Sequence, residues 1–287
     1  MPAVRIGVAT CAAVPNLDED GELLLAALAA ADVEASPRVW DDPRVDWGSF
    51  DAVLVRSTWD YPLRRDAFLR WSRSCRRTAN PGQVLEWNTD KHYLEDLATA
   101  GVRTVPTLFL PPGAGLGRPG GDYVVKPAVS GSAADTGRFR AGDDEGAHRL
   151  VGRLHAHGRT VMVQPYLDGI DTEGETSLIY LGGVYSHAVR REPLLTETGV
   201  RRPVVVADVL SEVRQVDASP QQRRVAESAL AQVPGGRGTL TYARVDLIPA
   251  DHGPVVLELE ATDCFLFLSY APAEALDRMV AHLLAAQ

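Results

Sequence analysis

The chain has 287 residues, more than one compact core usually spans, which predicts roughly two or three lobes. Its formal net charge of -9 argues against nucleic acid or an anionic membrane as a partner and favours small-molecule ligands. Three widely spaced cysteines indicate neither a disulfide framework nor a clustered metal site, and no export or membrane segment is recognised, so a cytoplasmic location is expected.

Short apolar runs alternate with helical stretches over the first eighty or so residues. We expect strands at 4–11, 33–40 and 52–58, and helices at 21–31 and 64–75. This order is typical of βαβ units and predicts a parallel sheet.

The middle of the chain carries one predicted helix and a strand. The helix begins after Asn88 or Thr89 as N-cap and ends before Gly101, and the strand covers 102–110. The Pro- and Gly-rich segment 111–121 is predicted to be a surface loop.

Strands and helices then alternate in an antiparallel style. We expect strands at 123–129, 137–141, 161–167, 176–181, 184–189, 239–249 and 254–261, and helices around 147–154, 220–233 and at the C-terminus. Gly182 and Gly183 indicate a hairpin turn, and Ser219 with Gln222 indicates a capping box. The predicted fold is an α/β N-terminal domain followed by α+β lobes, with boundaries at 1–85, 86–165 and 166–287.

Carboxylates gather on the last predicted hairpin, whose turn centres on His252. Because strand side chains alternate faces, Asp246 should face Glu258 and Arg244 should face Glu260, while Leu257 and Leu259 point to the other side. A solvated outer face of a sheet would look the same. A magnesium ion is the alternative, since Mg²⁺ is held by one or two carboxylates plus nucleotide phosphates.

Lysine is rare in this chain and stands at two positions only, Lys91 and Lys126, among 29 basic residues. Lys126 ends a strand and precedes a Gly/Ser loop whose backbone N–H groups could approach an anion; the loop includes Ser130, Gly131 and Ser132. A compact ammonium group can place one charge between phosphate oxygens where an arginine would fork.

These motifs together resemble the ATP-grasp carboxylate ligases over most of the chain after residue 85. The resemblance implies ATP and Mg²⁺ as cofactors, with Lys91, Lys126 and the Gly/Ser loop binding phosphates. It implies that Arg244 stabilises the transferring phosphoryl group and that Asp246, Glu258 and Glu260 hold magnesium, although most family members have asparagine in place of Glu260.

Residues 164–167 resemble the hinge strand of this family, which implies that Gln164, Tyr166 and Leu167 face adenine. Two acidic residues after the hinge fit the ribose position. Glu175 follows glycine as in the glutathione-synthetase-like members and is preferred, whereas Asp171 has the spacing of the D-alanine ligases.

Substrate residues are expected where the third predicted strand ends, because ligands bind at the carboxyl ends of parallel strands. That position carries Arg56, Ser57, Thr58, Asp60 and Tyr61. Arg190 and Arg191 are further candidates for the catalytic site, and since they point to opposite faces only one of them can reach it.

Several segments, among them 56–61, 168–183 and 258–268, look like the ATP-grasp subgroup that forms cycloserine from O-ureido-D-serine. The resemblance implies a ligase that activates an amino-acid carboxylate as an acyl phosphate and closes a ring. An intermolecular ligase joining amino acids and a non-catalytic ATP-binding module are the alternatives. Proteins of this fold family often form dimers, so a homodimer is an alternative to a monomer.

Overall fold

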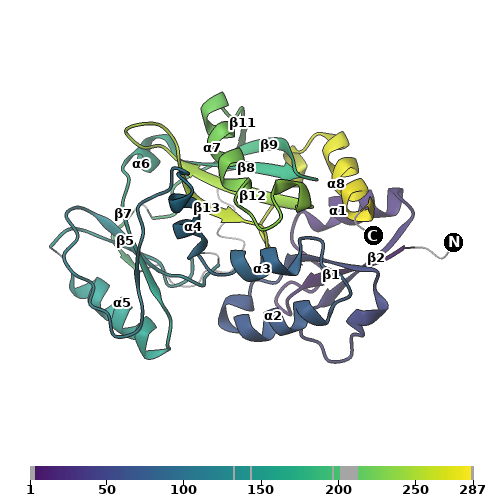
Figure 1. Ribbon diagram of the computed structural model, residues 1–287, viewed down its shortest axis with the longest axis horizontal. Coiled ribbons are helices and arrows are strands. Elements are labelled where there is room, and N and C mark those ends of the chain that lie inside the picture. The colour runs from purple at the N-terminus through teal and green to yellow at the C-terminus, as the bar shows by residue number, and fades with distance from the viewer. Residues whose placement is uncertain (1–3, 132, 143, 196, 201–212, 286–287) are drawn as a thin grey trace.

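The computed structural model describes residues 4–131, 133–142, 144–195, 197–200 and 213–285. Three sheets follow one another along the long axis of the molecule (Figure 1). Both ends of the chain lie at the right of that view, beside the N-terminal sheet.

A parallel three-stranded sheet opens the chain, as predicted. Its strands, in spatial order, are β2 (Val33–Val39), β1 (Val4–Thr10) and β3 (Ala52–Ser57). Helix α1 (Gly21–Ala30) and the C-terminal helix α8 (Ala273–Ala285) pack on one face, and α2 (Arg65–Ser74) packs on the other. The sheet is therefore covered on both sides, and β3 and most of β1 are buried, whereas the edge strand β2 is largely half-buried or exposed.

An antiparallel sheet forms the opposite end of the molecule, at the left of Figure 1. Its strands, in spatial order, are β10 (Gly199–Val200), β6 (Gly137–Phe139), β5 (Tyr123–Pro127), β7 (Val161–Pro165) and β4 (Leu108–Leu110). Helix α5 (Glu145–Ala156) packs on this sheet through Ala147, Leu150, Val151 and Leu154, the face that its helical spacing predicts.

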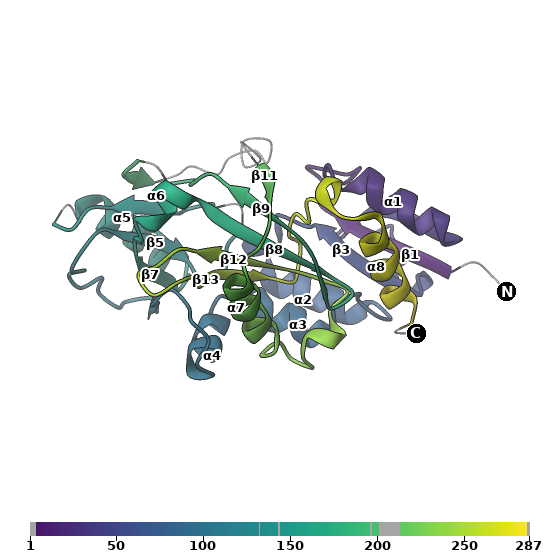
Figure 2. The same cartoon turned by 90° about the horizontal axis from the view of Figure 1, so that it is seen from above.

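A second antiparallel sheet occupies the centre, and its long strands are seen from above in Figure 2. Its order is β11 (Val213–Val216), β9 (Val184–Arg191), β8 (Glu175–Leu181), β12 (Tyr242–Ile248) and β13 (Val255–Glu260). The predicted turn between β8 and β9 is confirmed, because Gly182 and Gly183 both have positive φ, 59° and 72°. The short helix α6 (Gly169–Glu173) precedes β8, and the capped helix α7 (Pro220–Leu230) covers the sheet.

The helix expected after Asn88 or Thr89 begins later, as α4 (Tyr93–Thr99), and a short helix that was not predicted, α3 (Gly82–Asn88), precedes it. That start is wrong, because Asn88 is the last residue of α3 and is buried. Its amide group donates to the Leu259 carbonyl (2.7 Å) and accepts from the Ala261 N–H (2.7 Å), so it fastens α3 to the end of β13. Gly101 follows α4 with φ +80°, as expected for the residue past a helix end.

The strand expected over 102–110 is shorter than predicted. Val256 donates its N–H to the Arg103 carbonyl (2.8 Å), and Val105 donates to the Val256 carbonyl (3.0 Å). Pro106 has no N–H to continue this pairing, and the chain then pairs with β7 as β4. The segment therefore connects the two antiparallel sheets.

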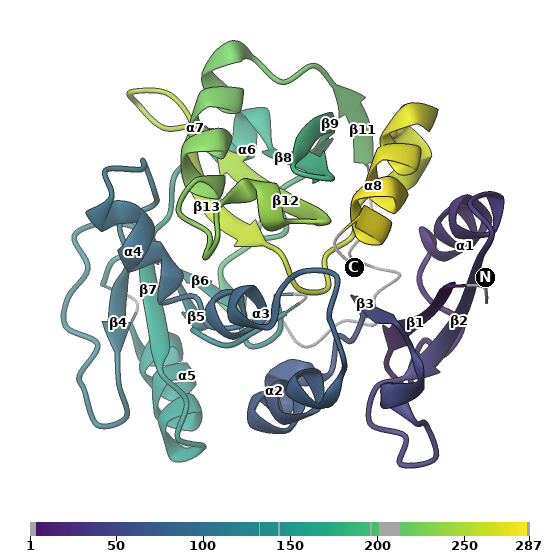
Figure 3. The same ribbon diagram turned by 45° about the vertical axis from the view of Figure 1, so that its right-hand side comes forward.

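The division at residues 85 and 165 stays a prediction. Helix α8 lies beside α1 (Figure 3), and β10 belongs to the sheet of β5 although it follows residue 165. Contacts thus cross both predicted boundaries.

Candidate functional site

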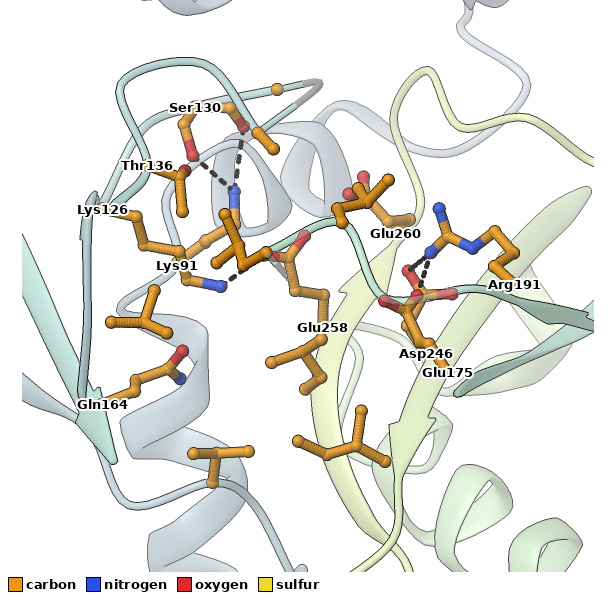
Figure 4. Close-up of a pocket in the computed structure, with 18 of the residues that line it drawn as sticks. Lys91, Lys126, Ser130, Thr136, Gln164, Glu175, Arg191, Asp246, Glu258 and Glu260 are labelled. Carbon is orange, nitrogen blue, oxygen red and sulfur yellow. Dashed lines mark hydrogen bonds and ion pairs between the residues drawn. The ribbon is translucent and has the colours of Figure 1, made fainter. Parts of the chain in front are cut away.

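A cavity lies between the two antiparallel sheets, and the N-terminal domain closes one end of it through Trp59 and Tyr61. Figure 4 shows Lys126 on one wall facing Glu258 on the other. The predicted residues that line the cavity are Tyr61, Lys91, Lys126, Ser130, Gly131, Gln164, Tyr166, Leu167, Glu175, Arg191, Arg244, Asp246, Glu258 and Glu260. Ser132 lies outside the described residues.

Both lysines are buried in this cavity, each 6% exposed. The Lys126 ammonium group donates to Glu258 Oε1 over 2.6 Å. The Lys91 ammonium group donates to the carbonyl and the hydroxyl of Ser130, at 2.9 and 3.1 Å, and so holds the start of the Gly/Ser loop. Two localised positive charges thus lie within one pocket, as phosphate binding requires.

The opposing pairs of the last hairpin are those predicted from the sequence. Asp246 is paired with Glu258 and Arg244 with Glu260 in the ladder between β12 and β13. The register shifts after Asp246, so that Leu247 pairs with Val256 and Leu257 is left over as a bulge. Leu259 is buried on the far side as expected, but the prediction for Leu257 is wrong, because the bulge turns it into the cavity.

The carboxyl groups of this hairpin differ in their electrostatic surroundings. Burial alone would raise the pKa of Glu258, but the charges of Lys126 and Lys91 hold it well below its ordinary value. Burial raises the pKa of Glu260 to about 7, against the opposing charge of Arg244, whose Nη2 lies 3.9 Å away. Glu258 is therefore a fixed anion, whereas Glu260 titrates near neutrality.

Asp246 is the centre of a buried charge cluster. It accepts hydrogen bonds from Arg244 Nε (2.8 Å) and Nη2 (2.9 Å) and from the Ser177 hydroxyl (2.7 Å), and Arg191 Nη2 lies 3.3 Å away. Burial alone would raise the pKa of Asp246, but the charges of Arg244 and Arg191 have the larger effect and lower it below its ordinary value.

Arg191, rather than Arg190, turns into the cavity. It forms ion pairs with Glu175 and Asp246 (Figure 4), whereas Arg190 does not line the cavity. Burial raises the pKa of Glu175 to about 7. Of the two ribose candidates only Glu175 lines the cavity; Asp171 does not line it and accepts a hydrogen bond from the Tyr166 hydroxyl and pairs with Arg138.

The other end of the cavity is apolar. Leu167, Ile170, Ile248 and Leu257 belong to one small cluster there, at the point where the hinge strand ends. Gln164 lies beside them, 3% exposed, and its amide donates to the Thr107 hydroxyl over 2.9 Å. Such a slot with a few polar groups suits a flat heterocycle.

The substrate set predicted from residues 56–61 needs correction, because among them only Trp59 and Tyr61 line the cavity. Arg56 is 1% exposed and points away, to Asp18 (3.5 Å) and Asp20 (3.4 Å). Ser57 is fully buried, and Asp60 accepts from the Trp40 indole N–H and pairs with Arg64. Thr58 reaches the cavity only indirectly, through a hydrogen bond to Asp263 (3.4 Å).

Several lining residues have no counterpart in the sequence-based prediction, notably Asp263, Cys264 and Phe265. They lie in the irregular loop after β13, where periodicity gives no information about side-chain direction. Their closeness in sequence to Glu258 and Glu260 was the available signal.

The carboxylates of the hairpin between β12 and β13 suit a metal ion that is also bound by the phosphates of a nucleotide. Within the described part of the chain, no three His, Cys, Asp or Glu side chains gather closely enough to hold a metal ion alone. Nucleotide-bound Mg²⁺ needs only one or two protein carboxylates, since phosphate oxygens and water complete its shell. Asp246 and Glu258, opposed in the ladder and both kept ionised, meet that requirement.

Comparisons with known proteins agree with this geometry. Residues 6–80 match the family model described as D-cycloserine synthetase DcsG, N-terminal domain. The chain is 35% identical over 280 residues to the cycloserine biosynthesis protein DcsG of Streptomyces lavendulae, and the match covers 91% of each. The chain belongs to the DcsG family.

Solved structures extend the similarity to the fold of the DcsG family. The crystal structure of D-cycloserine synthetase DcsG has a TM-score of 0.87 and 32% identity, covering 98% of this chain and 99% of that one. A RimK domain ATP-grasp protein from Sphaerobacter thermophilus has a TM-score of 0.67 at 16% identity, covering 98% and 100%. The fold is therefore that of the ATP-grasp proteins.

Among the residues with described positions, none forms a helix with the length and hydropathy needed to cross a bilayer.

Proposed function

We propose that this member of the DcsG family is an ATP- and Mg²⁺-dependent ligase that closes O-ureido-D-serine to D-cycloserine. The observation that carries the proposal is the match to DcsG over nine-tenths of the chain, together with the burial of both lysines of the sequence in one cavity. The substrate class is a small amino acid, and no residue of the chain needs to act as a covalent nucleophile.

The parts of the cavity suit the successive parts of ATP. The apolar slot beside Gln164 would take adenine, and Glu175 would lie near the ribose. Lys91, Lys126 and the loop at Ser130 would bind the phosphates, because they bring positive charge and backbone N–H groups to one wall.

Arg244 would face the phosphoryl group during its transfer to the substrate carboxylate, since its guanidinium group is fixed at the inner end of β12. Asp246 and Glu258 would hold Mg²⁺, with Glu260 beside them. When bound, the ion would neutralise charge on the phosphate oxygens. Catalysis by this chain then consists of positioning and charge stabilisation, as in other phosphoryl transfers.

Ring closure follows from the chemistry of an acyl phosphate. Transfer of the phosphoryl group gives ADP and the acyl phosphate, and attack by the nitrogen bound to the side-chain oxygen forms the C–N bond and releases phosphate. To reach cycloserine the carbamoyl group must also be hydrolysed: water adds to its carbonyl carbon, the bond from that carbon to the ring nitrogen breaks with a proton going to the nitrogen, and carbon dioxide and ammonia leave. Ammonia release therefore separates cyclisation from the joining of two amino acids.

The test measures ADP, ammonia and product mass after incubation with ATP, Mg²⁺ and a panel of amino acids that includes O-ureido-D-serine. Equal release of ADP and ammonia with a product of the mass of cycloserine is expected. Turnover with other amino acids alone would identify an intermolecular ligase, and tight ATP binding without turnover would indicate a non-catalytic module.

A further inference from the structure

Asp263 lies at the end of the cavity that the N-terminal domain closes, where Thr58 and Trp59 donate hydrogen bonds to it. Strand β13 passes Leu257 in the slot, Glu258 opposite Lys126, and Glu260 opposite Arg244 in the ladder. Three residues further along the chain, Asp263 lines the cavity beside Tyr61. Asp263 therefore lies beyond the phosphate-binding groups, where a molecule receiving the phosphoryl group would be.

The carboxyl group of Asp263 is buried and has little compensation. The residue is 8% exposed, and one oxygen accepts a long hydrogen bond of 3.4 Å from the Thr58 hydroxyl. Among the residues that the structure describes, no basic side chain forms an ion pair with it. Burial raises the pKa of Asp263 well above its ordinary value, and Glu260 adds to the effect. A buried carboxylate of this kind is stabilised strongly when a cation arrives.

Aromatic residues lie next to Asp263 in space and in sequence. The Trp59 and Phe265 rings lie 5.1 Å apart, and the Trp59 indole N–H donates to the backbone carbonyl of Asp263 over 3.3 Å. Tyr61 lines the same end of the cavity. Aromatic faces favour an organic cation over a hydrated metal ion, because they attract ammonium groups and exclude water.

An anion-binding group lies at the same end. Arg244 Nη1 donates to the carbonyl of Phe265 over 3.1 Å, so the guanidinium group is fastened to the loop that carries Asp263. The positive Arg244 side chain and the negative Asp263 side chain are thus held near each other, and such a pair complements a zwitterion. The carboxylate of an amino acid would face Arg244 and the phosphates, and its ammonium group would face Asp263.

We propose that Asp263 is the binding residue for the α-ammonium group of the amino-acid substrate. The proposal rests on the proposed function, because it takes the substrate to be an amino acid activated at its carboxylate. It gives this chain a way to reject carboxylic acids that lack the amino group, because such acids leave Asp263 buried and unpaired.

The test compares O-ureido-D-serine with 3-(ureidooxy)propanoic acid, the same molecule without its amino group, in the wild type and in Asp263→Asn. Asparagine keeps the shape and can still accept from Thr58, but it has no charge. We expect the wild type to prefer the amino acid in kcat/KM, and the variant to raise KM for the amino acid at least about 30-fold while leaving the des-amino acid unchanged. Asp251→Asn, in the exposed turn between β12 and β13, is the charge-matched control, and ATP affinity reports the integrity of the site.

An unchanged KM for O-ureido-D-serine in Asp263→Asn would overturn the proposal, and so would an equal loss on both compounds. If the wild type turns over a different amino acid, the cyclisation is wrong, and that amino acid and its des-amino counterpart decide the role of Asp263 by the same criterion. If the wild type neither binds nor turns over any amino acid of the panel, both proposals fail.

Discussion

Lys126 on β5 and Glu258 on β13 join the two walls of the cavity through a hydrogen-bonded ion pair of 2.6 Å. The two residues are 132 positions apart in the sequence and belong to different sheets. Each is a candidate ligand for a different part of a magnesium nucleotide, so substitution of each should give a different defect.

Lys126→Ala should weaken ATP binding at least about tenfold, because the phosphates lose a desolvated positive charge. Lys126→Arg should not restore the affinity, since the forked guanidinium group is larger than the buried ammonium group it replaces. Titration calorimetry with ATP and Mg²⁺ measures both, with Arg224→Ala on the exposed face of α7 as control. Wild-type affinity in Lys126→Ala would remove this residue from the phosphate site.

Glu258→Gln should fold with little change in melting temperature, because the amide oxygen can still accept from Lys126. ADP release should fall roughly a hundredfold or more, since a neutral amide is a poor ligand for Mg²⁺. A coupled ADP assay run at increasing Mg²⁺ tests this, and Glu274→Gln, exposed on α8, serves for comparison. A variant as active as the wild type would mean that the hairpin carboxylates do not hold the ion.

Asp20→Ala should destabilise the protein by about 3–5 kcal/mol. The Asp20 carboxylate accepts the N–H groups of Leu266 (2.8 Å) and Leu268 (2.7 Å) on either side of Phe267, whose φ is +51°, and it lies 3.4 Å from the buried Arg56. Loss of Asp20 leaves both amides and part of the arginine charge without a partner. Urea unfolding gives the free energy, with exposed Glu19→Ala as control; a change below about 1 kcal/mol would contradict the prediction.

Acid should destabilise the fold partly through His187. Burial lowers the pKa of this side chain below 6.5, and its Nε2 lies 3.0 Å from the Leu266 carbonyl. Below pH 6.5 the unfolded chain binds a proton that the folded chain does not, so this contribution is complete above pH 6.5 and is lost as the pH falls towards the folded pKa. The slope for one proton is at most about 1.4 kcal/mol per pH unit.

Urea unfolding at several pH values between 7 and 5 measures this slope. His187→Asn should show a shallower pH dependence than the wild type, whatever its stability at pH 7. His157→Asn, at the exposed end of α5, should keep the wild-type slope. Equal slopes in all three proteins would exclude His187 as the acid-sensitive group.

Regular elements explain which parts of the site could be predicted from sequence. The alternation in β12 and β13 placed Arg244 opposite Glu260 and Asp246 opposite Glu258, because side-chain direction in a strand follows from the residue count. The same count failed at Leu257, since one bulged residue reverses the direction and leaves no mark in composition. It also could not choose between Arg190 and Arg191 without knowing which face of β9 met the cavity.

Irregular segments explain the remainder. Arg56 was expected in the substrate site because it lies at the end of a parallel strand. Instead, it points away from the cavity and pairs with two buried aspartates that precede α1. Helix α3 was missed because its seven residues show too little periodicity. Asp263 follows no repeat at all, so its position became visible only in three dimensions.

The chain itself supplies partners for both ammonium groups of the pocket, because Lys91 donates to Ser130 and Lys126 forms an ion pair with Glu258. An incoming anion must therefore displace partners that are already in place, and its net gain is only the difference between old and new bonds. A bare anion brings no cation to take the place of Lys126 at Glu258. A polyphosphate with a bound divalent cation supplies a new partner for both groups, the phosphate for Lys126 and the cation for Glu258. The ion pair between Lys126 and Glu258 therefore favours binding of the complete magnesium nucleotide over a bare anion.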